Sequence, residues 1–297
     1  RGYTTAGFTA NGNGGSLAGL QKGFDVFEDP TLTYTKSMRG KTYCCNGLPT
    51  GELIVQRVKG WLERDQSKKK FLFVFFVDPH DPYVARRGAE SFGHSAMDRY
   101  DDEVAHADAH IAWILEGLLA AGHADDTIVV ITADHGEGFG EHGLRHHGNS
   151  LYGELLHVPL IVSVPGAAPR RVETPVSTID LGPTLLDLVG IDRPAGQNGR
   201  SLAATIVEGA PAPDRTILSE LIGIRREPRS MRAAYYGTWM ILWDLDANTY
   251  ELFSLTDDPL DQENLIDERP DVSADMKRRL RSASELELTL LPTDAKR

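Results

Sequence analysis

Residues 127–143 read Thr-Ile-Val-Val-Ile-Thr-Ala-Asp-His-Gly-Glu-Gly-Phe-Gly-Glu-His-Gly, and this stretch decides the fold. Its first half is an apolar, β-branched run without alternation, which is typical of a strand covered on both faces in a parallel sheet. The run ends at Asp134 and His135, and four glycines follow within eight residues. Because ligands of open α/β sheets bind beyond the carboxyl ends of strands, the stretch predicts a site here.

The residue types after this strand indicate a metal or anion site. A carboxylate and an imidazole, as in Asp134 and His135, suit Ca, Mn or Zn, and the pair by itself does not choose among them. The alternative is a glycine-rich loop with solvated side chains. Five further residues between 137 and 147 are glutamate or histidine, namely Glu137, Glu141, His142, His146 and His147. This density of ligand types favours the site over the plain loop.

A second apolar strand delivers polar residues in the same way. Residues 71–77 are wholly apolar, and Asp78-Pro-His-Asp-Pro-Tyr83 follows them. The two prolines stiffen this segment and restrict where His80 points. We therefore predict that His80 is functional rather than structural.

Two amphipathic helices are predicted, one at residues 51–62 before the strand at 71–77 and one at 100–119 between the two strands. The expected apolar stripe of the second helix is Val104, Ala107, Ile111, Ile114, Leu115 and Leu118. The acids at 98 and 101–103 are expected to favour the helix start rather than to bind a ligand. Alternation of helix and strand predicts an α/β fold, with a mostly parallel sheet flanked by helices.

The C-terminal part of the sequence predicts a different arrangement of helices and strands. Residues 158–165 predict a strand near a sheet edge, because prolines bracket its core, and residues 177–190 predict a helix ended by Gly190, with Asp180 as a capping residue. The Pro- and Gly-rich residues 191–213 predict a crossing loop or boundary. Short strands are then expected at 216–220, 231–236, 239–245 and 249–255, and a helix at 272–291. We predict an α/β domain over 1–210 and an α+β subdomain, a small antiparallel sheet plus helix, over 211–297.

The composition argues against several classes of protein. The net charge of −12 and the pI near 5.3 argue against nucleic-acid binding. No apolar run is long enough to cross a bilayer. The two cysteines, Cys44 and Cys45, are adjacent and rarely bridge in that position, so no disulfide framework is inferred and the compartment stays open.

The combined motifs resemble the sulfatase family of the alkaline phosphatase superfamily along almost the whole chain. The segments that carry the resemblance are Gly23-Phe-Asp, His80-x-Pro-Tyr83, Ile131-Thr-Ala-Asp-His-Gly-Glu137, Gly140-Glu-His-Gly143, His147-Gly148, Leu151-Tyr152, Val158-Pro-Leu-Ile161, Tyr250 to Pro259 and Glu263-Asn-Leu265. Many arylsulfatases have an Asp-Asn pair at the position of Asp134-His135. With its Asp-His pair, this sequence resembles the branch of the family that includes choline sulfatases and phosphonate monoester hydrolases.

The resemblance implies a metal-dependent sulfuric ester hydrolase. Asp134 and His135 would bind a divalent cation, calcium first and manganese second. His80 would bind the transferring group and protonate the leaving alkoxide. His147 matches the place of an anion-binding lysine, so its anion affinity would depend on pH near neutrality. The substrate would be a small sulfate ester, or a phosphate or phosphonate ester.

One part of the family pattern is not found. The nucleophile motif Cys/Ser-x-Pro/Ala-x-Arg, whose Cys or Ser becomes formylglycine, and the Asp-Asp pair upstream of it do not occur in this sequence. We therefore expect the family's first portion to be missing and the chain alone to be poorly active or inactive. The alternative is a non-catalytic protein that binds a metal or an anion. A sheet without its first strands would expose an edge, so self-association is also expected.

Overall fold

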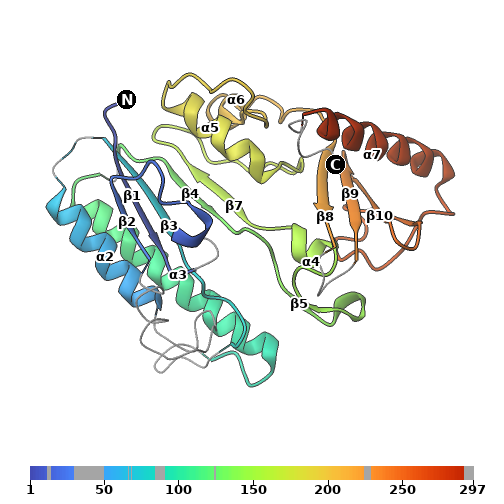
Figure 1. Cartoon of the computed structure of the whole chain (residues 1–297), viewed down its shortest axis with the longest axis horizontal. Coiled ribbons are helices and arrows are strands. Elements are labelled where there is room, and N and C mark those ends of the chain that lie inside the picture. Colours follow the sequence, from blue (N-terminus) through green and yellow to red (C-terminus); the bar gives the residue numbers. More distant parts are fainter. Residues whose placement is uncertain are drawn as a thin grey trace. The chain divides into compact units, whose positions relative to one another are not determined.

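The computed structural model describes residues 1–11, 15–29, 50–65, 67, 69–83, 91–123, 125–223 and 229–290. It divides into two compact units, Arg1–Thr127 and Ile128–Arg297 (Figure 1). The predicted subdomain 211–297 lies wholly within the second unit. Cys44 and Cys45 lie outside the described residues.

The first unit contains a parallel sheet with strand order β2-β1-β3. Its strands are β1 (Thr4–Thr9), β2 (Val26–Glu28) and β3 (Lys70–Phe75), and a short helix, η1 (Ser16–Ala18), lies between the first two. Strand β1 pairs with β3 over its whole length, from Thr4 opposite Lys70 to Thr9 opposite Phe75. The strand predicted at 71–77 is therefore confirmed, although β3 ends two residues earlier than expected.

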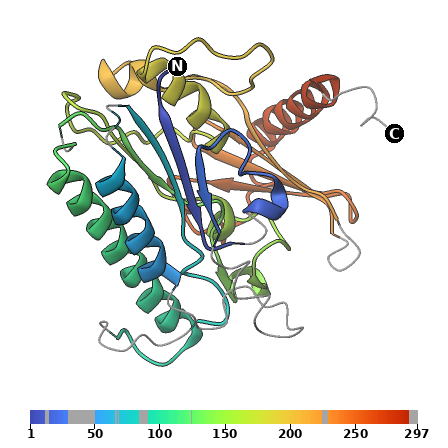
Figure 2. The same ribbon diagram turned by 60° about the vertical axis from the view of Figure 1, so that its left-hand side comes forward.

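Two helices pack side by side in this unit, α2 (Thr50–Arg64) and α3 (Ala96–Ala120) (Figures 1 and 2). The buried face of α2 meets the sheet through apolar side chains, and Phe8 of β1 contacts Trp61 edge-on with ring centroids 6.5 Å apart. The buried core consists of Ala6, Phe8, Ala10, Ile54, Val55, Val58, Trp61, Leu62, Val77 and Ile114. The predicted helix at 51–62 is confirmed.

The predicted apolar stripe of α3 is wrong in part. Val104 and Leu115 are exposed, whereas Glu103 and His110 are buried together with Ile114. Spacings of seven and four residues place these three buried side chains on one helix face. The acids also differ from expectation: Asp98 does close a capping box with Ser95 at the helix start, but Glu103 is buried one turn further along.

In the second unit, β4 (Val129–Thr132) pairs with β7 (Leu160–Ser163) in antiparallel orientation. The expectation of a parallel arrangement from the run at 127–133 is therefore wrong for this pair. Burial on both faces is not observed either, because Val129, Val130 and Ile131 are half-buried and Thr132 is exposed. An apolar run carries no information on the direction of the neighbouring strand. Beyond β4 the chain forms a small hairpin of two short antiparallel strands, β5 (Gly138–Phe139) and β6 (Arg145–His146), which are connected through η2 (Glu141–Gly143). Helix α4 (Gly153–Leu156) follows.

The segment predicted as one helix at 177–190 begins with η3 (Thr178–Asp180) and continues as α5 (Leu181–Leu188). The Asp180 carboxylate accepts from the Ser177 amide at 3.1 Å, as a capping role requires, and also from the Arg200 amide at 2.7 Å. The buried Asp180 carboxylate also forms an ion pair with Arg215. It therefore connects the start of the helix with the segments around Arg200 and Arg215. The predicted loop at 191–213 contains one short helix, α6 (Ala203–Val207).

The C-terminal prediction is confirmed. Strands β8 (Ile217–Leu221), β9 (Met231–Tyr236), β10 (Trp239–Asp244) and β11 (Thr249–Ser254) form an antiparallel sheet in the order β11-β10-β9-β8. Helix α7 (Pro270–Leu290) covers one face through Met276 and Leu280 (Figure 1). Leu151 and Tyr152, which precede α4, pack on a second cluster that includes Met240 and Phe253. None of the helices in the described part of the chain is both long and apolar enough to span a bilayer.

Candidate active site

The loop that follows β4 carries Asp134 and His135 into solvent, with side chains 57% and 42% exposed. Gly136 holds the loop in place, since its amide donates to the Leu155 carbonyl of α4 at 2.8 Å. A Cβ atom on Gly136 would lie 2.0 Å from the Glu154 carbonyl oxygen, which no side chain could tolerate. The glycine therefore permits the close backbone approach that positions the two ligand-type residues.

The ring of His135 is held with one nitrogen free for a ligand. Its Nδ1 lies 2.8 Å from the Gly136 carbonyl oxygen and must donate there, because a carbonyl only accepts. Nε2 then keeps its lone pair, and it lies 3.8 Å from Asp134 Oδ2. An outer hydrogen bond of this kind is what orients metal-binding histidines.

His147 is oriented by a buried carboxylate. Its Nδ1 lies 3.2 Å from Glu137 Oε1 and 3.4 Å from Oε2, and the Glu137 side chain is only 5% exposed. The rings of His147 and His135 stack, with centroids 4.2 Å apart and planes 28° apart. The structure therefore brings Asp134, His135 and His147 together, as the sequence predicted, and adds Glu137, which the sequence analysis left without a role.

The donor atoms present fit one divalent cation. An ion with ligand bonds of about 2.0–2.4 Å has neighbouring ligands roughly 3–4 Å apart, and the 3.8 Å between Asp134 Oδ2 and His135 Nε2 lies in that range. One oxygen and one nitrogen leave most of a coordination sphere open. The chemistry of the pair suits a cation that also takes oxygen ligands from water or from a bound anion.

His142 has a structural part in this region. Its Nε2 lies 2.6 Å from the Asp261 carbonyl oxygen and its Nδ1 lies 3.1 Å from Glu154 Oε1. The ring stacks on Tyr152 with centroids 3.7 Å apart. Partial burial opposes protonation of His142, but the two acceptors outweigh it and raise the pKa of His142. His142 thus joins the hairpin to α4 and to the loop after β11, whereas His146 is exposed.

His80 belongs to the first unit, where it follows β3. Its amide donates to Glu103 Oε2 at 3.3 Å, and its Nδ1 lies 2.6 Å from the Asp81 carbonyl oxygen. Since that carbonyl accepts, Nδ1 carries the proton of this hydrogen bond. Burial of Glu103, which contradicts the expected stripe of α3, thus serves to anchor the backbone at His80.

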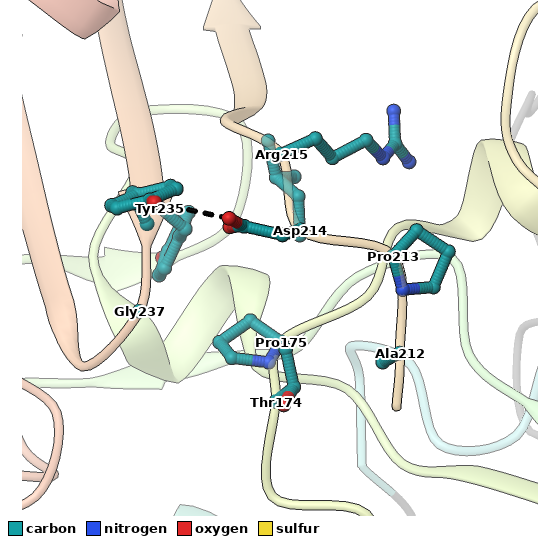
Figure 3. A pocket seen from close by; sticks show the side chains of 10 residues that line it. Thr174, Pro175, Ala212, Pro213, Asp214, Arg215, Tyr235 and Gly237 are labelled. Carbon is teal, nitrogen blue, oxygen red and sulfur yellow. Dashed lines mark hydrogen bonds between the residues drawn. The ribbon is translucent and has the colours of Figure 1, made fainter. Parts of the chain in front are cut away.

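A pocket of about 260 Å³ lies elsewhere in the second unit (Figure 3). It is lined by Thr174, Pro175, Ala212, Pro213, Asp214, Arg215, Ile217, Tyr235, Tyr236 and Gly237. The Tyr236 hydroxyl donates to Asp214 at 3.2 Å. None of the residues predicted for the active site lines this pocket.

Comparison with protein families identifies the chain. Residues 1–191 match the family described as Sulfatase. This chain belongs to the sulfatase family. Residues 140–285 also match the family described as N-sulphoglucosamine sulphohydrolase, C-terminal. The resemblance inferred from the sequence motifs is thereby confirmed, and so is the α/β class with its C-terminal antiparallel sheet.

Individual sulfatases and related hydrolases are similar over long stretches. A choline-sulfatase from Rhizobium meliloti is 29% identical over 250 residues, which cover 68% of this chain and 48% of that protein. The phosphonate monoester hydrolase of Silicibacter pomeroyi shares the fold, with a TM-score of 0.73 and 18% identity over 98% of this chain and 79% of that one. BT4656, solved with its substrate D-glucosamine-2-N,6-O-disulfate, has a TM-score of 0.72 and 16% identity, covering 96% and 80% of the two chains. The chain spans about half the length of the curated relatives that it matches, or less.

Proposed function

We propose that this sulfatase-family chain serves in the metal-dependent hydrolysis of sulfuric esters. Asp134 and His135 hold the divalent cation in this proposal, and His147 binds the sulfate group. Calcium is the expected ion and manganese the alternative. A cation at such a site neutralises charge on the oxygens of the bound ester.

The observation that carries the proposal is the paired orientation of two imidazoles. The Gly136 carbonyl directs Nε2 of His135 toward Asp134, and the buried Glu137 carboxylate sets the ring of His147 beside it. A plain solvated loop would not need a buried glutamate to orient a surface histidine. The similarity to a choline-sulfatase supports sulfate as the group that is bound.

His80 is assigned to the leaving group in this proposal. The hydrogen bond from its Nδ1 to the Asp81 carbonyl fixes the ring, and the imidazole is the group that would give a proton to the leaving alkoxide. We expect turnover by this chain alone to be weak or absent, because the printed sequence contains no Cys/Ser-x-Pro/Ala-x-Arg motif. The test below therefore measures binding and does not depend on turnover.

The metal part is tested with Mn²⁺ as a paramagnetic probe of the ¹⁵N-labelled chain. We expect Mn²⁺ to broaden amide signals around residues 134–148, calcium to reverse the broadening, and the double substitution of Asp134 and His135 by alanine to abolish it. His157→Ala is the matched control, since His157 is an exposed histidine of the same unit. Broadening that survives the double substitution unchanged would refute the metal assignment.

The anion part uses sulfate, phosphate and methylphosphonate in turn, followed through the ring signals of His147. Sulfate is expected to shift these signals, and Glu137→Gln is expected to weaken the response about tenfold while Mn²⁺ broadening persists. A response to methylphosphonate but not to sulfate would replace the sulfuric ester by a phosphonate ester. Absence of any response to the three anions would support the alternative of a protein that binds metal without an ester.

A further inference from the structure

A second group of metal-ligand side chains lies in the first unit, between α2 and α3. Glu52 is in the first turn of α2, and His106 and His110 are four residues apart on α3 and therefore on the same helix face. His106 Nε2 lies 3.4 Å from Glu52 Oε1, and His110 Nε2 lies 3.9 Å from Glu52 Oε2. One donor atom from each of the three side chains lies within 4.8 Å of the others. Figures 1 and 2 both show the two helices side by side.

The surroundings of this cluster hold the histidines in place. The His110 side chain is fully buried and its ring lies 5.8 Å from Phe76 and 5.2 Å from Trp113, measured between centroids. A Cβ atom on Gly51 would lie 2.3 Å from the His110 ring, so the glycine at the start of α2 makes the room that this imidazole occupies. The ring of His106 meets that of His110 edge-on, with centroids 4.2 Å apart.

Two of the ligand atoms in this cluster, one from Glu52 and one from His106, are enclosed without a hydrogen bond to any described residue. Glu52 Oε2 and His106 Nε2 are both buried, and neither makes a hydrogen bond within the described part of the chain. Burying a carboxylate oxygen and an imidazole nitrogen without a hydrogen bond or a cation is costly. An ion bound between them would remove that cost.

We propose that Glu52, His106 and His110 form a binding site for Zn²⁺ that joins the start of α2 to the middle of α3. Two imidazole nitrogens and one carboxylate oxygen are a ligand set that zinc takes in proteins. Tetrahedral bonds of about 2.0–2.1 Å place neighbouring ligands about 3.4 Å apart. The distances here are 3.4 Å from Glu52 Oε1 to His106 Nε2 and 3.9 Å from Glu52 Oε2 to His110 Nε2, so a rotation of the Glu52 carboxylate would bring one of its oxygens near that spacing from both rings. The fourth position is left for water. This site is separate from Asp134 and His135 and does not depend on the proposed function.

The experiment uses the full chain with Asp134 and His135 replaced by alanine, so that the proposed catalytic metal cannot contribute. Zn²⁺ binding is measured by equilibrium dialysis, and Co²⁺ is substituted to record the visible absorption of a four-coordinate ion. We expect one equivalent of zinc, four-coordinate Co²⁺ absorption, and a loss of affinity of about tenfold or more in Glu52→Gln and in His106→Asn. His123→Asn is the matched control, because His123 is a partly buried histidine of the same unit that faces the exposed Asp126 at 3.4 Å.

Replacement of the fully buried His110 would disturb the packing of the first unit, so the variants change the two less buried ligands, Glu52 and His106. Zinc should raise the midpoint of thermal unfolding in the parent and in His123→Asn, and this rise should be lost in Glu52→Gln and His106→Asn. Binding of zinc with undiminished affinity by those two variants would overturn the proposal, as would a parent that binds no zinc. The Mn²⁺ broadening around residues 134–148 reports on the other site, so the two proposals fail separately.

Discussion

Replacing Gly136 by alanine would add a methyl group where the backbone of α4 already lies. The new Cβ would be 2.0 Å from the Glu154 carbonyl oxygen, whereas ordinary contacts begin at 3.4 Å. The loop or the helix must therefore move by roughly 1.4 Å, the difference between these distances. A shift of that size also breaks the hydrogen bond from the Gly136 amide to the Leu155 carbonyl, which is now 2.8 Å long.

The expected cost follows from these two changes. Overpacking of a close contact costs about 1–3 kcal/mol, and loss of a backbone hydrogen bond adds about 0.5–1.5 kcal/mol. We therefore expect Gly136→Ala to lower the free energy of unfolding by about 1.5–4.5 kcal/mol. Because the loop bears Asp134 and His135, Mn²⁺ broadening around residues 134–148 should weaken as well.

The assay is urea denaturation followed by circular dichroism and tryptophan fluorescence, with coincident transitions as the test for two-state unfolding. Gly182→Ala in α5 is the matched control. Its Cβ would meet only the end of the flexible Gln197 side chain, and alanine favours a helix by up to about 1 kcal/mol over glycine. If Gly136→Ala costs less than about 0.5 kcal/mol, as a surface substitution does, the loop is not held by this close approach.

Three further substitutions test the contacts that support the second unit. Asp180→Ala leaves Arg215 without its buried partner, and we expect a loss of about 3–5 kcal/mol in urea denaturation. The raised pKa of His142 contributes stability that is fully present below the unfolded value of about 6.5 and is lost as pH rises through the folded value. The stability difference between the parent and His142→Gln should therefore shrink as pH rises above about 6.5. Tyr152→Phe removes the 2.9 Å hydrogen bond to the Glu251 carboxylate, and thermal denaturation should report a loss of about 1.5–3 kcal/mol.

Each of these substitutions has a control with a similar but less buried contact. Asp187→Ala breaks a half-exposed pair with Arg193 and should cost less than about 1 kcal/mol. His157→Gln should leave the pH dependence of stability as it is in the parent, and Tyr250→Phe should cost little, because the ring stack on Trp243 is kept. Equal losses in Asp180→Ala and Asp187→Ala, or an unchanged pH dependence in His142→Gln, would contradict the roles given to these residues.

Local sequence patterns predict the positions of most helices and strands. The four C-terminal strands, α2 and α7 begin and end within a few residues of their predicted positions, because helical and strand periodicity are properties of neighbouring residues. The same holds for the placing of Asp134 and His135 immediately after β4. His147 was grouped with them through a family motif, and the structure places its ring on that of His135.

Contacts between distant residues needed the tertiary structure. The role of Glu137 depends on its burial beside a histidine ten residues further along, and the composition of a glycine-rich loop does not reveal which of its acids is enclosed. The antiparallel pairing of β4 with β7 was mispredicted for a related reason, since an apolar run does not report the direction of the neighbouring strand.

The sequence by itself determined the class of fold, the family and the ligand types beyond β4, because these follow from short-range pattern and from motifs with fixed spacing. The tertiary structure decided which face of α3 is buried, and so it placed His110 and Glu103 inside the first unit. The tertiary structure also places the Glu52 carboxylate 3.4 Å from the imidazole of His106, which lies fifty-four residues further along the chain. Burial and convergence of this kind arise from packing of one element on another, which no local pattern encodes.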